Sequence, residues 1–160
     1  MKAKEFNLPD ESGEFHKLSN YHGRWVVLYF YPKDDTPGCT KEACGFRDGL
    51  SQLEELGVAV LGVSKDTPKS HQKFKEKYHL NFPLLSDESK EVIQAYGAWG
   101  EKSFMGRKFS GILRKTYLID PEGEIKKIYE KVNPAKHSAE ILADVKVFLN
   151  KYFNPTGFMK

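Results

Sequence analysis

The sequence predicts an α/β fold in which helices flank a mixed central β-sheet. Two continuous apolar runs, WVVLYFY at residues 25–31 and VAVLGVS at residues 58–64, have the composition of strands buried on both faces. A helical pattern lies between them, so the three segments form a strand–helix–strand unit with parallel pairing. The sequence DPEG at 120–123 is a tight turn that joins two later extended segments and adds antiparallel strands.

The first part of the chain predicts a hairpin, a strand and a helix. Residues 5–18 are interpreted as short extended pieces around a turn at Ser12 and Gly13, which would form an N-terminal hairpin. After the strand at 25–31, residues 40–56 are predicted to be helical, because apolar side chains recur there at helical spacing and Gly57 supplies a stop signal. That apolar stripe consists of Phe46, Leu50, Leu53 and Leu56.

The second part of the chain continues the alternation. Thr67 and Pro68 open a helix that runs to about Tyr78, since proline is well tolerated in a first helical turn. Residues 97–111, which glycines interrupt, are expected to form a loop. The other predicted elements are a strand at 84–86, a helix at about 89–96, a β-hairpin at 112–119 and 124–131, and a last helix at about 138–152.

This order of elements is the plan of the thioredoxin fold, with an N-terminal hairpin extension and one added strand–helix unit. The length of 160 residues predicts a single domain that can bury a substantial core, with a short tail from about residue 153. A fold of this kind does not determine function by itself.

Composition and charge exclude several classes of partner. The net charge is +3, and lysines and arginines are interleaved with acidic residues, so a solvated mixed surface is favoured over nucleic-acid binding. No segment approaches the roughly 20 apolar residues that a membrane span requires. The opening MKAKEFNLPDES lacks the apolar run of a secretory signal, so we expect a reducing, cytoplasmic location.

The only two cysteines are Cys39 and Cys44. In a reducing compartment they are not expected to form a structural disulfide. Metal binding is poorly supported, because Cys-x4-Cys has no second cysteine pair and the histidines have no ligand-like spacing. These histidines are His16, His22, His71, His79 and His137. We therefore expect neither a metal nor a cofactor.

Cys39 occupies a position that favours a reactive thiolate. With Thr36 as the N-cap and Pro37 as the first helical residue, Cys39 falls in the first turn of a helix. Free N–H groups and the positive end of the helix dipole stabilise an anion there and lower the pKa of a thiol. The alternative is that Cys39 merely fills a small apolar space.

The spacing of Cys44 distinguishes it from ordinary disulfide-exchange motifs. Two residues five apart in a regular helix have Cα atoms roughly 8 to 9 Å apart, whereas a disulfide needs them within about 7 Å. Bond formation therefore requires the first turn of the helix to unwind. This spacing suits a task in which Cys39 reacts alone and Cys44 then captures the product.

Several stretches carry a resemblance to a known family. YPKDDTPGC matches the peroxiredoxin pattern Pro-x-x-x-Thr-x-x-Cys at Pro32, Thr36 and Cys39. GCTKEACGFRD, with its second cysteine, and the later YGAWGEKSFMGRKFSGILRKTYLIDPEG resemble the Q-type, or bacterioferritin-comigratory-protein, branch of that family. The resemblance covers about residues 6–149.

The resemblance implies an atypical two-cysteine, thiol-dependent peroxidase that reduces hydrogen peroxide and organic hydroperoxides. Cys39 would be the peroxidatic cysteine and Cys44 the resolving cysteine of an intramolecular disulfide, which thioredoxin then reduces. Thr36 would hydrogen-bond the thiolate and the peroxide, and Arg114 would lower the thiol pKa and orient the peroxide. Pro32 would shield the pocket from water. No cysteine lies near the C-terminus, so a monomer is expected.

Each of these roles has a simpler alternative. Thr36 would cap a helix without any catalysis, Arg114 would serve as a strand-surface arginine, and Pro32 would end its strand. Glu42 suits the helix dipole and is interpreted as mainly structural. Lys115 departs from the small hydroxyl residue that the family leads us to expect, and we predict that it points away from the site. At the level of function, the alternatives are a redox sensor and a general thiol–disulfide oxidoreductase.

Overall fold

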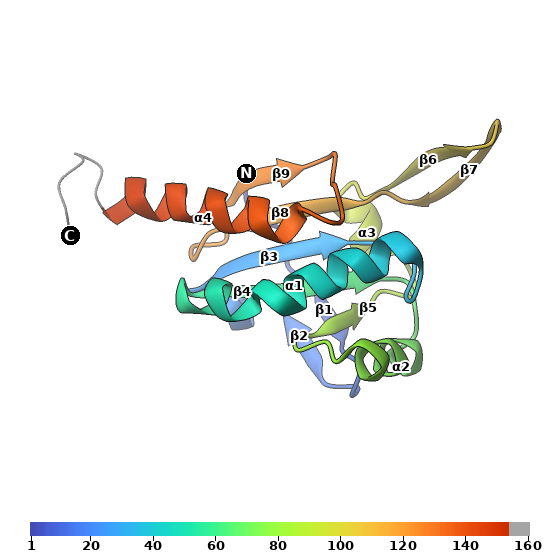
Figure 1. The fold of residues 1–160 in the computed structure, drawn as a ribbon, viewed down its shortest axis with the longest axis horizontal. Coiled ribbons are helices and arrows are strands. Elements are labelled where there is room, and N and C mark those ends of the chain that lie inside the picture. Colours follow the sequence, from blue (N-terminus) through green and yellow to red (C-terminus); the bar gives the residue numbers. More distant parts are fainter. Residues whose placement is uncertain (154–160) are drawn as a thin grey trace.

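A five-stranded mixed β-sheet forms the centre of the molecule in the computed structural model, which describes residues 1–153 (Figure 1). In spatial order its strands are β5 (Leu84–Ser86), β4 (Val58–Ser64), β3 (Trp25–Phe30), β8 (Lys115–Ile119) and β9 (Ile125–Tyr129). The strands β3, β4 and β5 are parallel, and β8 is antiparallel to both of its neighbours. The predicted mixed sheet is confirmed.

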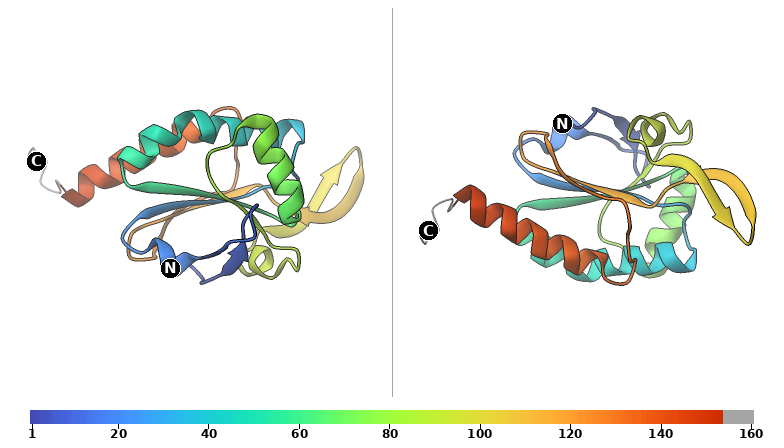
Figure 2. Two further views of the ribbon diagram at one scale, coloured as in Figure 1. Left: turned by 90° about the horizontal axis from the view of Figure 1, so that it is seen from below. Right: turned by 90° about the horizontal axis from the view of Figure 1, so that it is seen from above.

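Helices and an N-terminal hairpin cover the two faces of this sheet. Helices α1 (Pro37–Glu55), α2 (Pro68–Tyr78) and α4 (His137–Phe153) lie on one face (Figure 2). The other face carries the hairpin, the 3-10 helix η1 (Leu18–Tyr21) and the short helix α3 (Glu91–Ala95). The hairpin pairs β1 (Asn7–Pro9) with β2 (Phe15–Lys17), as predicted. Within the described residues, no helix combines the length and the apolar character that crossing a membrane requires.

Strand β3 supplies side chains to both halves of the core. Trp25, Val27 and Tyr29 pack in the cluster under α1 and α4, whereas the alternate residues Val26 and Leu28 pack in the cluster on the opposite face. All six residues of the strand are buried, and full burial of each large apolar side chain contributes about 1.5–3 kcal/mol. The strand is therefore a rigid base for the loop that follows it.

The prediction of a loop at 97–111 is wrong. Strands β6 (Trp99–Phe104) and β7 (Arg107–Ile112) pair in antiparallel register and form a ribbon that projects from the body of the molecule (Figure 1). Met105 and Gly106 both have positive φ, 52° and 80°, which suits a two-residue hairpin turn whose twist matches the strands. The ribbon is largely solvent-exposed and lacks an apolar face, so its sequence carries little strand signal.

The ribbon also shifts the boundary of the hairpin that follows. Ile112 ends β7, and β8 begins at Lys115. Arg114 was expected on a strand, but it lies in the short connection between these two strands. The Leu113 N–H donates to the Ala98 carbonyl at 2.7 Å and holds this connection in place. Helix α3 is also shorter than the predicted 89–96, and the predicted tail falls largely outside the described residues.

Candidate active site

The loop that leaves β3 turns into helix α1 at the predicted position. Thr36 has the extended backbone of an N-cap residue, and its carbonyl accepts from the Thr40 N–H at 2.8 Å. Its side chain does not cap the helix, since Oγ1 donates to the Lys33 carbonyl at 3.0 Å instead. The lone pairs of that hydroxyl oxygen are left available to another donor. Pro32 is half-buried and lies two residues after the end of β3.

Cys39 is the third residue of α1, and 1% of its surface is exposed. The Arg114 guanidinium, from the connection before β8, donates from Nη2 to the Cys39 sulfur at 3.2 Å. A fixed positive charge and the first-turn N–H groups of the helix therefore act on the same sulfur atom. The structure thus brings together two of the predicted site residues that are 75 positions apart.

Glu42 also belongs to this group, although its position in the sequence indicates only a structural role. Arg114 donates from Nη1 to Glu42 Oε1 at 2.6 Å, so one guanidinium joins the carboxylate and the sulfur. Glu42 is buried, which raises the pKa of its carboxyl to about 7 although Arg114 opposes the change. Its second oxygen is buried and has no hydrogen-bond partner among the residues that the structure describes. The signal in the sequence was the i, i+3 spacing of Cys39 and Glu42, which places them on one helix face.

Gly38 makes room for the guanidinium. A Cβ atom at this position would lie 3.2 Å from Arg114 Nη2, tighter than an ordinary contact. A side chain at this position would require Arg114 to shift by a few tenths of an ångström, so glycine suits the approach of the guanidinium to the sulfur. This is a specific reason for the glycine in TPGC, beyond a close turn of the backbone.

Cys44 lies one and a half turns further along α1 and is half-buried and free, as Cys39 is free. Because α1 is continuous from Pro37 to Glu55, the two sulfur atoms cannot bond while the first turns of the helix are intact. Arg47, one turn beyond, donates to the Tyr78 carbonyl at 2.7 Å and fixes this part of α1 to the end of α2. Lys115 pairs with Glu130 at 3.3 Å, in accord with the prediction that it points away.

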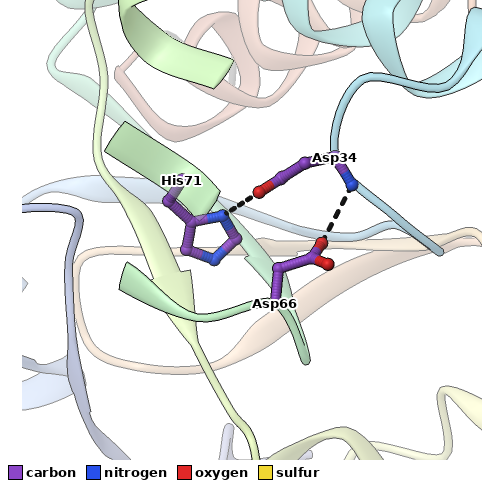
Figure 3. A group of neighbouring side chains, drawn as sticks. All are labelled: Asp34, Asp66 and His71. Atoms are coloured by element: carbon purple, nitrogen blue, oxygen red, sulfur yellow. Dashed lines mark hydrogen bonds and ion pairs between the residues drawn. The ribbon is translucent and has the colours of Figure 1, made fainter. Parts of the chain in front are cut away.

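One group near the loop has the residue types of a metal site. Potential ligand atoms of Asp34, Asp66 and His71 lie within 4.8 Å of one another (Figure 3). However, His71 Nδ1 is 2.7 Å from Asp34 Oδ2, and Asp66 Oδ2 accepts from the Asp34 N–H at 2.9 Å. These atoms already bind one another in a buried setting. The arrangement therefore fits a hydrogen-bonded network and not a metal centre.

Comparison with known proteins agrees with this geometry. The sequence model of the AhpC/TSA family matches residues 1–128. The chain belongs to the AhpC/TSA family. Among curated relatives of this peroxiredoxin, a Bcp peroxiredoxin of Coxiella burnetii is 54% identical over 142 residues, which is 89% of this chain and 94% of the relative. Peroxiredoxin Bcp of Escherichia coli K12 is 46% identical over 140 residues, 88% of this chain and 90% of the relative.

Solved structures give the same result for the fold. The bacterioferritin comigratory protein of Xanthomonas campestris superposes with a TM-score of 0.84 at 38% identity, over 89% of this peroxiredoxin and 91% of that chain. A peroxiredoxin Q from Xylella fastidiosa gives a TM-score of 0.86 at 34% identity, over 93% and 97% of the two chains. The predicted thioredoxin-like fold and the predicted Q-type branch are confirmed. The protein is a thiol peroxidase that acts on peroxides and is reduced by a thiol.

Proposed function

We propose that Cys39 is the peroxidatic cysteine of this peroxiredoxin, that Cys44 resolves it within the same chain, and that thioredoxin reduces the resulting disulfide. The observation that carries the proposal is the 3.2 Å hydrogen bond from Arg114 to a buried sulfur at a helix N-terminus. The other cysteine, Cys44, is half-buried and lies further along α1, away from its N-terminus.

The first step is attack of the Cys39 thiolate on the terminal oxygen of the peroxide. An S–O bond forms as the O–O bond breaks, and the transferred oxygen keeps its hydrogen. The other oxygen leaves as hydroxide or alkoxide and takes a proton from solvent to become water or an alcohol. Cys39 is oxidised to a sulfenic acid by two electrons. Arg114 stabilises both the thiolate and the negative charge on the leaving oxygen, and it keeps its own charge at any working pH.

Two further residues support this step. Thr36 directs its hydroxyl hydrogen to the Lys33 carbonyl, and its lone pairs suit a peroxide O–H as donor. Pro32 sits between the fully buried Tyr31 and the exposed Lys33, where an apolar ring reduces access of water. A dry pocket strengthens the electrostatic effect of the guanidinium.

The second step is capture of the sulfenic acid. After the first turns of α1 unwind, the Cys44 thiolate attacks the Cys39 sulfur, an S–S bond forms, the S–O bond breaks, and hydroxide leaves as water after protonation. Trapping by Cys44 protects Cys39 from further oxidation to sulfinic acid. A dithiol such as thioredoxin then reduces the disulfide by exchange, in keeping with a reducing, cytoplasmic location.

The substrates in this proposal are hydrogen peroxide and small organic hydroperoxides. Support for the organic class comes from the Xanthomonas campestris relative, whose structures concern alkyl peroxide reduction. A monomer is proposed because both cysteines of the cycle lie on one helix of one chain. Since Cys39 is almost fully buried, large protein disulfides have no access to it, which disfavours a general thiol–disulfide oxidoreductase.

Two variants test the assignment. Cys39→Ser is expected to abolish peroxide consumption. Cys44→Ser is expected to consume one equivalent of peroxide and then to stall as a sulfenic acid or overoxidise, because no second thiol captures the product. Full turnover of Cys44→Ser with thioredoxin would contradict the resolving role. Slow peroxide chemistry in the unmodified protein, together with oxidation-dependent binding of another protein, would favour a redox sensor.

A further inference from the structure

A buried network joins helix α2 to the loop that precedes Cys39. Asp34, in that loop, accepts from the Tyr31 hydroxyl at 2.5 Å and from the Ser70 hydroxyl at 2.8 Å. Its Oδ2 also lies 2.7 Å from His71 Nδ1 (Figure 3). His71 is completely buried, and Asp34 is 7% exposed. Three side-chain partners therefore hold the Asp34 carboxylate in a fixed position.

The two ring nitrogens of His71 show that this is a charge-assisted contact or its proton-transferred equivalent. Nε2 lies 3.1 Å from the Leu85 carbonyl, which only accepts, so Nε2 carries a hydrogen. A second hydrogen lies between Nδ1 and the Asp34 oxygen, because two facing lone pairs would repel at 2.7 Å. The pair therefore shares one proton between two buried side chains, and burial strengthens such a hydrogen bond.

The same loop has further connections away from α1. The Asp34 N–H donates to Asp66 Oδ2, which also accepts from Ser64 at the end of β4, at 2.7 Å. Asp35 has a positive φ of 58° and binds Lys77 and Tyr78 of α2, each at 2.8 Å. Two consecutive loop residues are thus fixed to residues outside α1.

The helix start has little of its own to hold it. The Thr36 side chain makes no capping hydrogen bond, and the first turn of α1 has no acidic residue. Capping by a side chain contributes about 1 kcal/mol where it is present. The position of the first residues of α1 is therefore held mainly by the preceding loop. In that loop Asp34, two residues before Thr36, contacts His71.

We propose that Asp34 and His71 are positioning residues for the first turn of α1, which carries Cys39. They hold the entry into α1 so that Cys39 stays beside Arg114, and they set the N-terminal limit of the segment that unwinds for the disulfide. This inference rests on the proposed roles of Cys39 and Cys44. It adds the residues that control the rate of the peroxide reaction relative to the rate of disulfide formation. The network is local to the side chains described above, and none of its members touches the reacting atoms.

The test is Asp34→Asn, which keeps the size of the side chain and removes its charge. Rapid mixing measures the second-order rate of peroxide with Cys39 and the first-order rate of disulfide formation.

Loss of the charge-assisted bond shifts the equilibrium between the intact and the unwound first turns of α1 toward the unwound form by roughly tenfold. We therefore expect slower peroxide reaction, faster disulfide formation and less sulfinic acid. Asp35→Asn is the matched control, because it keeps an acceptor for Tyr78 and removes only the exposed charge that pairs with Lys77. It is expected to change both rates less than threefold, as surface pairs contribute about 0–1 kcal/mol.

A spectroscopic measurement keeps the proposal falsifiable should Asp34→Asn fold poorly. Nitrogen-15 NMR of labelled histidine in the reduced protein is expected to show hydrogen at, or shared with, both ring nitrogens of His71. Ser70→Ala, which removes one donor at a half-buried position, is expected to change the two rates in the same opposed directions by a smaller factor.

Opposite changes in the two rates support the proposal, since a merely destabilised protein loses both. Unchanged rates in a folded Asp34→Asn protein, or rates that fall together, would overturn it. These outcomes are separate from failure of the proposed function. If the unmodified protein forms no disulfide between Cys39 and Cys44, the proposed cycle itself is wrong.

Discussion

Glu42→Gln is predicted to change how stability depends on pH. Burial raises the pKa of Glu42 from 4.5 to about 7 in the folded protein. Between these values the folded state keeps a proton that the unfolded state has released. Stability from this group is therefore present below about pH 4.5 and is lost as the pH rises toward 7, which is the reverse of a salt-bridged surface carboxylate. Glutamine has no such titration.

The magnitude follows from the same two values. The gap between 4.5 and about 7 corresponds to about 3 kcal/mol, since one pKa unit is equivalent to about 1.4 kcal/mol. Other carboxylates titrate equally in both proteins, so they cancel in the difference. The free energy of unfolding of Glu42→Gln minus that of the unmodified protein should therefore rise by about 3 kcal/mol across this window.

The assay is urea unfolding of both proteins under reducing conditions, from about pH 4 to about pH 8, with the two curves compared at each pH. A difference that rises with pH supports a buried, neutral Glu42 at low pH. A difference that is constant would show that Glu42 titrates alike in both states. A difference that falls with pH would show that the ion pair with Arg114 outweighs burial.

Three other substitutions test the geometry of the site and the core. Arg114→Ala should lower the second-order rate with peroxide by a factor on the order of 10²–10³, and Lys115→Ala, at the adjacent position, should not. Gly38→Ala places a Cβ 3.2 Å from Arg114 Nη2 and should lower that rate by about tenfold; an unchanged rate would refute the need for glycine. Gly62→Ala places a Cβ 2.9 Å from Tyr29 Cζ and should lower the free energy of unfolding by about 1–3 kcal/mol, measured by urea unfolding; a stability equal to that of the unmodified protein would contradict this packing.

Buried elements were the part of the fold that the sequence predicted best. Strands β3 and β4 are apolar on both faces, so composition alone identifies them. The ribbon of β6 and β7 was missed because its residues are mostly exposed, and neither face needs apolar side chains. Its glycines resemble loop punctuation, although Gly100 and Gly111 lie opposite each other in the ladder.

In the candidate site, the residues of one local motif could be predicted, whereas the contacts between distant parts of the chain could not. Cys39 and Thr36 belong to one local motif, and their positions at the start of α1 agree with the prediction. Arg114 lies between β7 and β8 and not on a strand as predicted, in a connection where the Leu113 N–H donates to the Ala98 carbonyl. The Arg114–Glu42 pair spans 72 positions, so no local pattern reveals it.

The Asp34–His71 contact was beyond sequence reasoning for the same physical reason. The two residues are 37 positions apart, and only the packing of α2 against the loop brings them together. The lack of ligand-like spacing among the histidines concerns metal binding, and it carries no information about a buried hydrogen bond of His71.

The central claim is that Cys39 and Cys44 form the redox couple of this peroxiredoxin. The most direct measurement is to reduce the protein, remove the reductant, add one equivalent of hydrogen peroxide, and within seconds count free thiols and record the intact mass. We predict loss of both thiols and a monomer mass lower by two hydrogens. Two thiols that remain free after minutes would contradict the claim.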